Sequence, residues 1–159
     1  NKVLIPFGKY RSIQISNLEK GLVEVRNDTG WGYSNFEGKA LTPINYNQVN
    51  YLGSDNIIIC RDRMGKYGVW NFDMEIIIPF EYDKIEVRAY HDNNGRFLNE
   101  TSMIGMKDSL WTAFDICGNK LFSNWYEEIT FIKGGAYGVR LNGKLKAVSK
   151  EEVDYPYVK

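Results

Sequence analysis

The sequence predicts an all-β protein, an antiparallel β-repeat array of about four units. Short runs rich in Val, Ile, Tyr, Phe and Trp are separated by glycines and by Asn-Gly or Asp-Gly type turns, which is the pattern of strands and hairpins. One block of sequence recurs along the chain at a spacing typical of repeat proteins. The distances between turns leave no room for long helices.

The repeated block is clearest over residues 65–85, where Gly-Lys-Tyr-Gly leads into an apolar run, a proline and Tyr-Asp-Lys-Ile. Aligning the chain on the aromatic residue of this block gives one column with the members Trp31, Tyr67, Trp111 and Leu145. These positions are separated by 36, 44 and 34 residues, so the third unit carries an insertion of about eight residues. We expect the three aromatic rings of this column to be buried and stacked between units.

The alignment divides a single domain, residues 1–159, into five stretches. They are residues 1–15 (partial), 16–52, 53–90, 97–133 and 134–159 (partial), all to within a few residues. We expect about three strands in each complete unit.

Turn residues bound the expected strands of the first two units. These strands are residues 3–7, 12–16, 22–26, 31–36, 56–61, 67–72 and 76–78. Residues 22–26 alternate apolar and polar side chains, as a strand with one buried face does. Proline cannot donate a hydrogen bond to a sheet, so Pro79 should end its strand or lie on a sheet edge.

The third and fourth units follow the same pattern with more departures. Their expected strands are residues 82–89, 101–107, 110–116, 120–122, 136–141 and 144–149. Asn142-Gly143 predicts a type I′ hairpin turn. Residues 153–156 are compatible with one further strand.

The repeated motifs resemble those of the WG-repeat family, also called KWG repeats, which are bacterial β-rich repeats. The matching motifs are Gly30-Trp31-Gly32, Gly65-Lys66-Tyr67-Gly68 and Asn142-Gly143-Lys144. The sequence departs from the family pattern at Thr112 and Lys146, which replace the second glycine, at Leu145, which replaces the tryptophan, and at Ser123, which replaces the proline. The resemblance covers nearly the whole chain and implies a repeat scaffold without implying a catalytic mechanism.

Repeat sheets expose an apolar face until a neighbour covers it, so two arrangements satisfy the sequence. The units either stack linearly, as in a β-solenoid, or pack radially, as propeller blades do. The N-terminal stretch supplies the back half of a unit and residues 135–149 supply a front half, which favours radial closure. A ring of four blades is small, which favours the linear stack, and both arrangements remain open.

Composition excludes several classes of protein. The chain has 159 residues, 43% of them hydrophobic, which is enough for a core. Its 20 basic and 20 acidic residues cancel, so no overall field attracts nucleic acid. Cys60 and Cys117 lie at non-equivalent repeat positions without a CxxC or zinc spacing, so we expect neither a disulfide framework nor a metal site.

The sequence also shows no run approaching the ~20 apolar residues of a membrane span and no charged-then-apolar leader. We therefore expect a soluble protein of either the bacterial cytoplasm or the cell envelope. The first residue is Asn and not Met, which is compatible with a leader or further repeats upstream.

The carboxylates that could suggest catalysis recur once per unit. Asp83 and Glu127 share one column, and Asp115 shares another with Asn35 and Asn71. A local task, hydrogen bonding of the backbone at turns, explains such recurrence. We therefore assign no catalytic residue, no cofactor and no enzymatic activity.

The insertion and the remaining aromatic residues are the candidate binding residues. The insertion is polar and has turn chemistry, so we expect it to form a protruding loop between Tyr90 and Phe97. Loops held by rigid sheets concentrate binding residues. Exposed rings can stack on sugars or anchor a protein partner. The candidates are His91, Asp92, Asn93, Asn94, Arg96, Trp70, Tyr90 and Trp125. The alternative interpretation is a neutral insertion and rings that pack in the core.

The leading hypothesis is a non-enzymatic binding scaffold of the WG-repeat type for a protein partner. The alternative is a glycan-binding or cell-envelope-binding module. Fusion to an intracellular effector domain would favour the first, and a leader peptide would favour the second.

Overall fold

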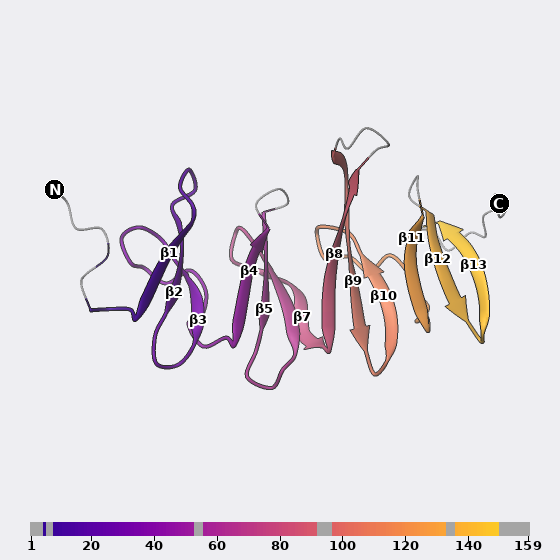
Figure 1. Ribbon diagram of the computed structural model, residues 1–159, viewed down its shortest axis with the longest axis horizontal. Coiled ribbons are helices and arrows are strands. Elements are labelled where there is room, and N and C mark those ends of the chain that lie inside the picture. Colours follow the sequence, from indigo (N-terminus) through magenta and orange to yellow (C-terminus); the bar gives the residue numbers. More distant parts are fainter. Residues whose placement is uncertain (1–4, 6–7, 53–55, 92–96, 133–135, 150–159) are drawn as a thin grey trace. The chain divides into compact units, whose positions relative to one another are not determined.

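The computed structural model describes residue 5 and residues 8–52, 56–91, 97–132 and 136–149 (Figure 1). In these residues the protein is all-β: thirteen strands form four small antiparallel sheets, and no residue is helical. Each sheet is built from strands that are consecutive in the sequence, so each takes up one part of the colour gradient in Figure 1. The prediction of an all-β antiparallel repeat array is confirmed.

The sheets are named A to D in chain order. Sheet A contains β1 (Ser12–Asn17), β2 (Leu22–Arg26) and β3 (Trp31–Ser34). Sheet B contains β4 (Gln48–Leu52), β5 (Ile57–Arg61), β6 (Tyr67–Asn71) and β7 (Ile76–Tyr82). Sheet C contains β8 (Lys84–His91), β9 (Phe97–Lys107) and β10 (Leu110–Phe114). Sheet D contains β11 (Glu128–Ile132), β12 (Ala136–Leu141) and β13 (Lys144–Ser149).

Hairpin turns occur where the sequence places glycine and asparagine. Asn142 and Gly143 have φ angles of 51° and 71°, the left-handed pair that a type I′ turn requires, and they join β12 to β13 as predicted. The expected strands at residues 3–7 and 153–156 lie outside the described residues, apart from residue 5.

The sheets are offset from the repeat units that the sequence suggests. The stretch at residues 16–52 contains β2, β3 and β4, but β4 pairs with β5, which belongs to the following stretch. Each of sheets B, C and D begins two residues after a tyrosine of one column, namely Tyr46, Tyr82 and Tyr126. Self-similarity determines the period of a repeat but not where its folded unit starts.

A fourth segment lies beside the third strand of three sheets. In sheet B it is β7, which ends the strand order and is therefore an edge strand, and it contains Pro79 as the proline prediction allows. In sheets A and C the corresponding segment makes isolated bridges, Trp31 with Tyr46 and Trp111 with Tyr126. The Trp31 N–H donates to the Tyr46 carbonyl at 2.8 Å, and the Tyr46 N–H donates back at 3.1 Å.

The chain forms two compact units, residues 1–80 and residues 81–159. In the first unit one face of sheet A packs against one face of sheet B. Its core contains Leu22 and Tyr33 from sheet A and Ile58 and Cys60 from sheet B. In the second unit sheets C and D pack through the equivalent faces, with Ile104, Ala113, Tyr137, Val139 and Val148 in the core.

The aromatic column is not the buried ladder that the sequence suggested. Trp31, Tyr67 and Trp111 are only half-buried. Each ring lies against a cation: the Arg26 guanidinium carbon is 5.1 Å from the Trp31 ring centroid, the Arg61 carbon is 5.6 Å from that of Tyr67, and Lys84 Nζ is 5.8 Å from that of Trp111. The buried aromatic column is instead Tyr46, Tyr82 and Tyr126, which are 6%, 5% and 4% exposed.

The insertion lengthens a hairpin. We expected a loop between Tyr90 and Phe97, but β8 continues to His91 and β9 begins at Phe97, with Tyr90 paired to Leu98 and His91 paired to Phe97. β8 and β9 have 8 and 11 residues, whereas the equivalent β4 and β5 have 5 each. The extra residues therefore add mostly to the paired strands. Residues 92–96 lie outside the described part.

Candidate interaction surface

The sequence-predicted site residues fall in different compact units. Trp70 lies on β6 in the first unit, whereas the other seven belong to residues 81–159. The backbones of Tyr90 and His91 form the end of β8. Asp92, Asn93, Asn94 and Arg96 lie outside the described residues.

All four tryptophans have their rings or indole nitrogens engaged by the protein. Cations lie over Trp31 and Trp111, as described above. The Trp70 indole N–H donates to the Tyr46 hydroxyl at 3.1 Å. Trp125 stacks on Tyr82 at 6.3 Å between centroids, and Lys120 Nζ lies 4.5 Å from its centroid. All four rings are half-buried, so part of each is engaged in contacts within the protein.

The predicted structural role of the recurring carboxylates is confirmed. Asn35, Asn71 and Asp115 each accept a hydrogen bond through Oδ1 from the backbone N–H four residues later, at 2.9, 2.9 and 2.8 Å. Asp83 accepts from the Asp108 N–H at 3.0 Å, and Glu127 accepts from the Gly143 N–H at 3.2 Å. Each of these acceptors therefore stabilises a turn. Among the described residues no group of three or more His, Cys, Asp or Glu is placed to hold a metal ion.

Burial also shifts the pKa of titratable side chains in the core. It raises the pKa of the Cys60 thiol to about 12, and it raises the pKa of Tyr46 to about 12 against a smaller opposing effect of the hydrogen bond from Trp70. Both cysteines are free thiols, Cys60 buried and Cys117 exposed.

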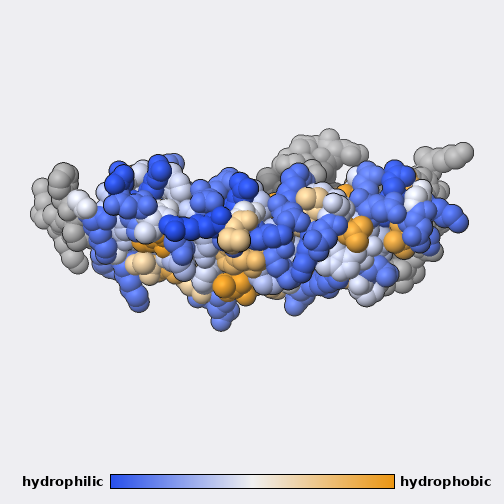
Figure 2. Space-filling view, turned by 90° about the horizontal axis from the view of Figure 1, so that it is seen from below, coloured by the Kyte–Doolittle hydropathy of each residue, from blue (hydrophilic) through white to orange (hydrophobic). Residues whose placement is uncertain are grey.

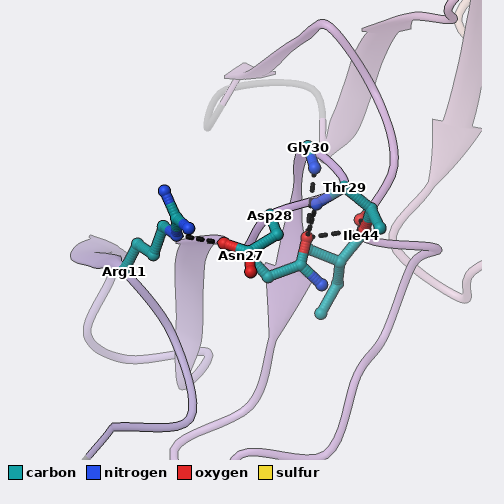
Figure 3. A network of polar contacts seen from close by, with 6 residues as sticks. All are labelled: Arg11, Asn27, Asp28, Thr29, Gly30 and Ile44. Atoms are coloured by element: carbon teal, nitrogen blue, oxygen red, sulfur yellow. Dashed lines mark hydrogen bonds and ion pairs between the residues drawn. The ribbon is translucent and has the colours of Figure 1, made fainter.

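A polar network fixes the turn between β2 and β3 (Figure 3). Asn27 Oδ1 accepts the Thr29 N–H at 2.8 Å and the Gly30 N–H at 3.1 Å, and Thr29 Oγ1 lies 2.6 Å from the Ile44 carbonyl oxygen. Asp28 forms an ion pair with Arg11. The turn lines a polar hollow of about 320 Å³. Its side chains are bound to one another and to backbone, so the network stabilises the turn.

An apolar groove lies on the other face of sheet A from the core. It has a volume of about 310 Å³, and the residues that line it are Ile5, Ile13, Ile15, Leu18, Val23 and Phe36. We call this surface the open face of sheet A. Ile13, Ile15 and Leu18 are 49%, 57% and 69% exposed. The molecule otherwise presents a mostly hydrophilic surface on the side drawn in Figure 2, with hydrophobic residues in small patches.

The equivalent positions of sheet B are covered. Val49 and Tyr51 occupy the register positions of Ile13 and Ile15, and they pack against the cluster that contains Leu22 and Tyr33 of sheet A. Sheet D shows the same cover in the second unit, where Ile129 is 7% exposed and packs with residues of sheet C. Within the described residues no sheet covers Ile13 and Ile15, and in this respect sheet A differs from sheets B and D.

The open face could not be recognised from the sequence. Ile13 and Val49 occupy the same register position, and the similarity of their strands gives no sign that Ile13 is the exposed one. The signal available was the Ile-Gln-Ile alternation of β1, which marks an apolar strand face but not whether a neighbour covers it.

Comparison with protein-family models and with curated proteins gives no match. Twenty-five chains of solved structures match. Among them is the computationally designed Ika4 protein, at 14% identity and a TM-score of 0.39, with 94% of this chain and 98% of that chain covered. Another is the computationally designed Ika8 protein, at 14% identity and a TM-score of 0.37, with 90% of this chain and 48% of that chain covered. The chain thus spans about half of the Ika8 chain.

The described residues include no helix long and apolar enough to cross a membrane.

Proposed function

We propose that the protein is a non-enzymatic binding scaffold of the WG-repeat type that contacts a protein partner through the open face of sheet A. The observation that carries the proposal is the exposure of Ile13, Ile15 and Leu18 beside an apolar groove. Exposed apolar surface of this kind is characteristic of protein–protein contact sites. The sheets hold the face rigidly, which reduces the entropic cost of binding.

The engagement of the four tryptophans favours a protein partner over a glycan. Sugar-binding modules use exposed rings as stacking platforms, whereas here each ring or indole N–H already contacts a tyrosine or a cation. Titration with cell-wall and glucan oligosaccharides should therefore leave tryptophan fluorescence unchanged. A saturable change would favour the glycan alternative.

The test of the proposed surface compares two matched substitutions. Ile15→Lys places a charge in the open face, and Ile76→Lys places the same charge at the start of β7, where Ile76 is 52% exposed against 57% for Ile15. Each immobilised full chain is incubated with extract of the source cell, and retained proteins are quantified. We expect Ile15→Lys to lose proteins that the wild type and Ile76→Lys retain. Equal retention by all three chains would refute the proposal.

A further inference from the structure

Four exposed arginines gather where the turns of sheets A and B meet. The Arg11 N–H donates to the Arg26 carbonyl at 2.8 Å, and Arg63 on the β5–β6 turn donates to the Thr29 carbonyl on the β2–β3 turn. Arg61 is the last residue of β5, two positions before Arg63. The two turns lie at the lower side of Figure 1, and Figure 2 views the molecule from that side. We call Arg11, Arg26, Arg61 and Arg63 the arginine cluster.

Contacts with the fold hold three of these guanidinium groups in place. The Arg26 guanidinium lies over the Trp31 ring, and that of Arg61 lies over the Tyr67 ring. Arg61 Nε also donates to a carbonyl oxygen of its own turn at 3.3 Å, and Arg63 is held by its bond to the neighbouring turn. A guanidinium has five N–H donors, and within the described residues these contacts use at most one donor of each group. Groups fixed in this way lose little conformational entropy on binding.

Most of the cluster has no carboxylate partner. Arg11 forms an ion pair with Asp28, but no ion pair joins the other three arginines to an acidic side chain within the described part of the chain. The other acid of the two turns is Asp62, whose Oδ1 accepts the Lys66 N–H at 2.8 Å. This end of the first unit is therefore positively charged, although the formal charge of the whole chain is zero.

Sheet D pairs the equivalent arginine with an acid. Arg140 contacts Glu128, the residue opposite it on β11, and Arg140 Nε lies 3.0 Å from Glu128 Oε2. Arg26 and Arg61 take the register position of Arg140 in sheets A and B. The residues opposite them on the first strands are neutral, namely Ser12 in sheet A and Gln48 in sheet B. This position of the fold thus binds a carboxylate in sheet D and has no acid opposite it in sheets A and B.

The residue before each first strand differs in the same way. In all four sheets its N–H donates to a carbonyl near the end of the second strand, so the positions are equivalent. The residue is an acid in the second unit, Asp83 in sheet C and Glu127 in sheet D. It is Arg11 or Asn47 in the first unit. Acidic residues therefore occupy this position in sheets C and D, and basic or neutral residues occupy it in sheets A and B.

We propose that the arginine cluster binds an acidic segment of a partner protein, rich in Asp and Glu. A planar guanidinium binds a carboxylate through two parallel hydrogen bonds, and carboxylates of the partner supply the acid that Glu128 supplies in sheet D. The two acids among the arginines disfavour a nucleic-acid backbone, whose phosphates present continuous negative charge. This goes beyond the proposed function, because the cluster contains none of the residues that line the open face of sheet A.

Fluorescence anisotropy with the full chain and a short labelled poly-L-glutamate peptide tests this contact. Arg26→Gln and Arg140→Gln are matched variants, because they remove the same charge from the same register position. We expect Arg26→Gln to weaken binding about threefold, the effect of one exposed ion pair, and Arg140→Gln to stay near the wild type. Binding should weaken as the salt concentration rises from about 20 mM to about 150 mM.

Circular dichroism establishes that each variant is folded, which is expected because the arginines of the cluster are exposed. A wild type that does not bind the peptide at about 1 mM would overturn the proposal. Equal weakening by Arg26→Gln and Arg140→Gln would also overturn it, because binding would then follow only the total charge of the chain. Tighter binding of single-stranded DNA than of the peptide would show that the partner class is wrong. If the arginine variants have no effect but Ile15→Lys still loses retained proteins, the proposed function stands without this second surface.

Discussion

The second glycine of the Gly-Trp-Gly motif leaves space for the fourth segment to cross sheet A, and Gly32→Ala tests that role. A Cβ atom at Gly32 would lie 2.6 Å from the Pro43 carbonyl oxygen and 2.9 Å from Ile44 Cα. Both are backbone atoms, which cannot move aside as a flexible side chain does. Sheet B shows a related constraint: Gly68 occupies this position, and a Cβ there would lie 2.7 Å from the ring of Phe80 on β7. In sheet C this glycine is replaced by Thr112.

The destabilisation by Gly32→Ala can be worked out from the atoms that must shift to make room for the Cβ. Overpacking by one methyl group in a rigid site typically costs about 1 to 3 kcal/mol. Shifting residues 43–46 also strains the reciprocal hydrogen bonds between Trp31 and Tyr46, of 2.8 and 3.1 Å, and losing one of them costs about 1 kcal/mol. Replacing glycine by alanine restricts the unfolded chain, which offsets about 0.5 to 1 kcal/mol. We therefore expect Gly32→Ala to lower the free energy of unfolding by about 1 to 3.5 kcal/mol.

Urea unfolding followed by tryptophan fluorescence measures this difference. Gly143→Asn is the control, because no atom lies within 4 Å of a Cβ there and asparagine tolerates the φ of 71°. The control should change the free energy of unfolding by less than about 1 kcal/mol. A Gly32→Ala midpoint equal to that of the wild type would refute the steric explanation of the motif.

Two further predictions concern the aromatic side chains. Tyr33→Ala removes a fully buried ring and should lower the free energy of unfolding by about 3 to 5 kcal/mol. Trp31→Ala removes a half-buried ring and one cation contact and should lower it by about 1 to 2 kcal/mol. Equal decreases for the two variants in urea unfolding would contradict this order. Burial raises the pKa of Tyr46 and of Tyr82 to about 12, so the folded protein keeps protons that the unfolded chain loses above pH ~10. Stability should be unaffected by these groups below pH ~10 and should fall as the pH rises toward 12, and an unchanged urea midpoint over that range would contradict it.

Most of the strands could be predicted because their signals are local. Residues 22–26, 136–141 and 144–149 have the predicted bounds, since alternating side chains and turn glycines determine where a strand begins and ends. The same logic predicted the turn-stabilising role of Asp83, Asp115 and Glu127, because a residue type that recurs once per unit performs a task internal to the unit.

Features that depend on neighbouring sheets could not be predicted in this way. The sequence pattern of β1 resembles that of β4, yet Ile15 is exposed and Tyr51 is packed. Sheet A covers this face of sheet B, whereas within the described part of the chain no sheet covers the same face of sheet A. The extent of the β8–β9 hairpin was missed for a related reason, and of the expected loop only His91 lies in the described part, where it is paired. Residues beside a turn can either loop out or extend the paired strands, and the choice depends on cross-strand pairing such as that of His91 with Phe97.

Each aromatic ring of the column contacts a cation, but the cation does not come from the same strand in every sheet. In sheets A and B the cation is the arginine opposite the ring, Arg26 or Arg61. In sheet C that position is Met106, and the cation comes instead from Lys84 on the first strand. The register position of Lys84 in sheet A is occupied by Ser12.

The arrangement of sheet C can be tested in sheet A by two substitutions. Arg26→Met should lower the free energy of unfolding by about 0.5 to 1 kcal/mol, the usual value of an exposed cation–π contact. Adding Ser12→Lys should restore most of that loss, because a lysine at this position reproduces the arrangement of Lys84, Met106 and Trp111. Ser12→Lys in the wild-type background is the control and should have little effect, since Arg26 already covers the ring. A double-mutant cycle in urea measures the coupling. Additive effects of the two substitutions would show that the arrangement in sheet C is a coincidence of sequence and that the column is held by packing alone.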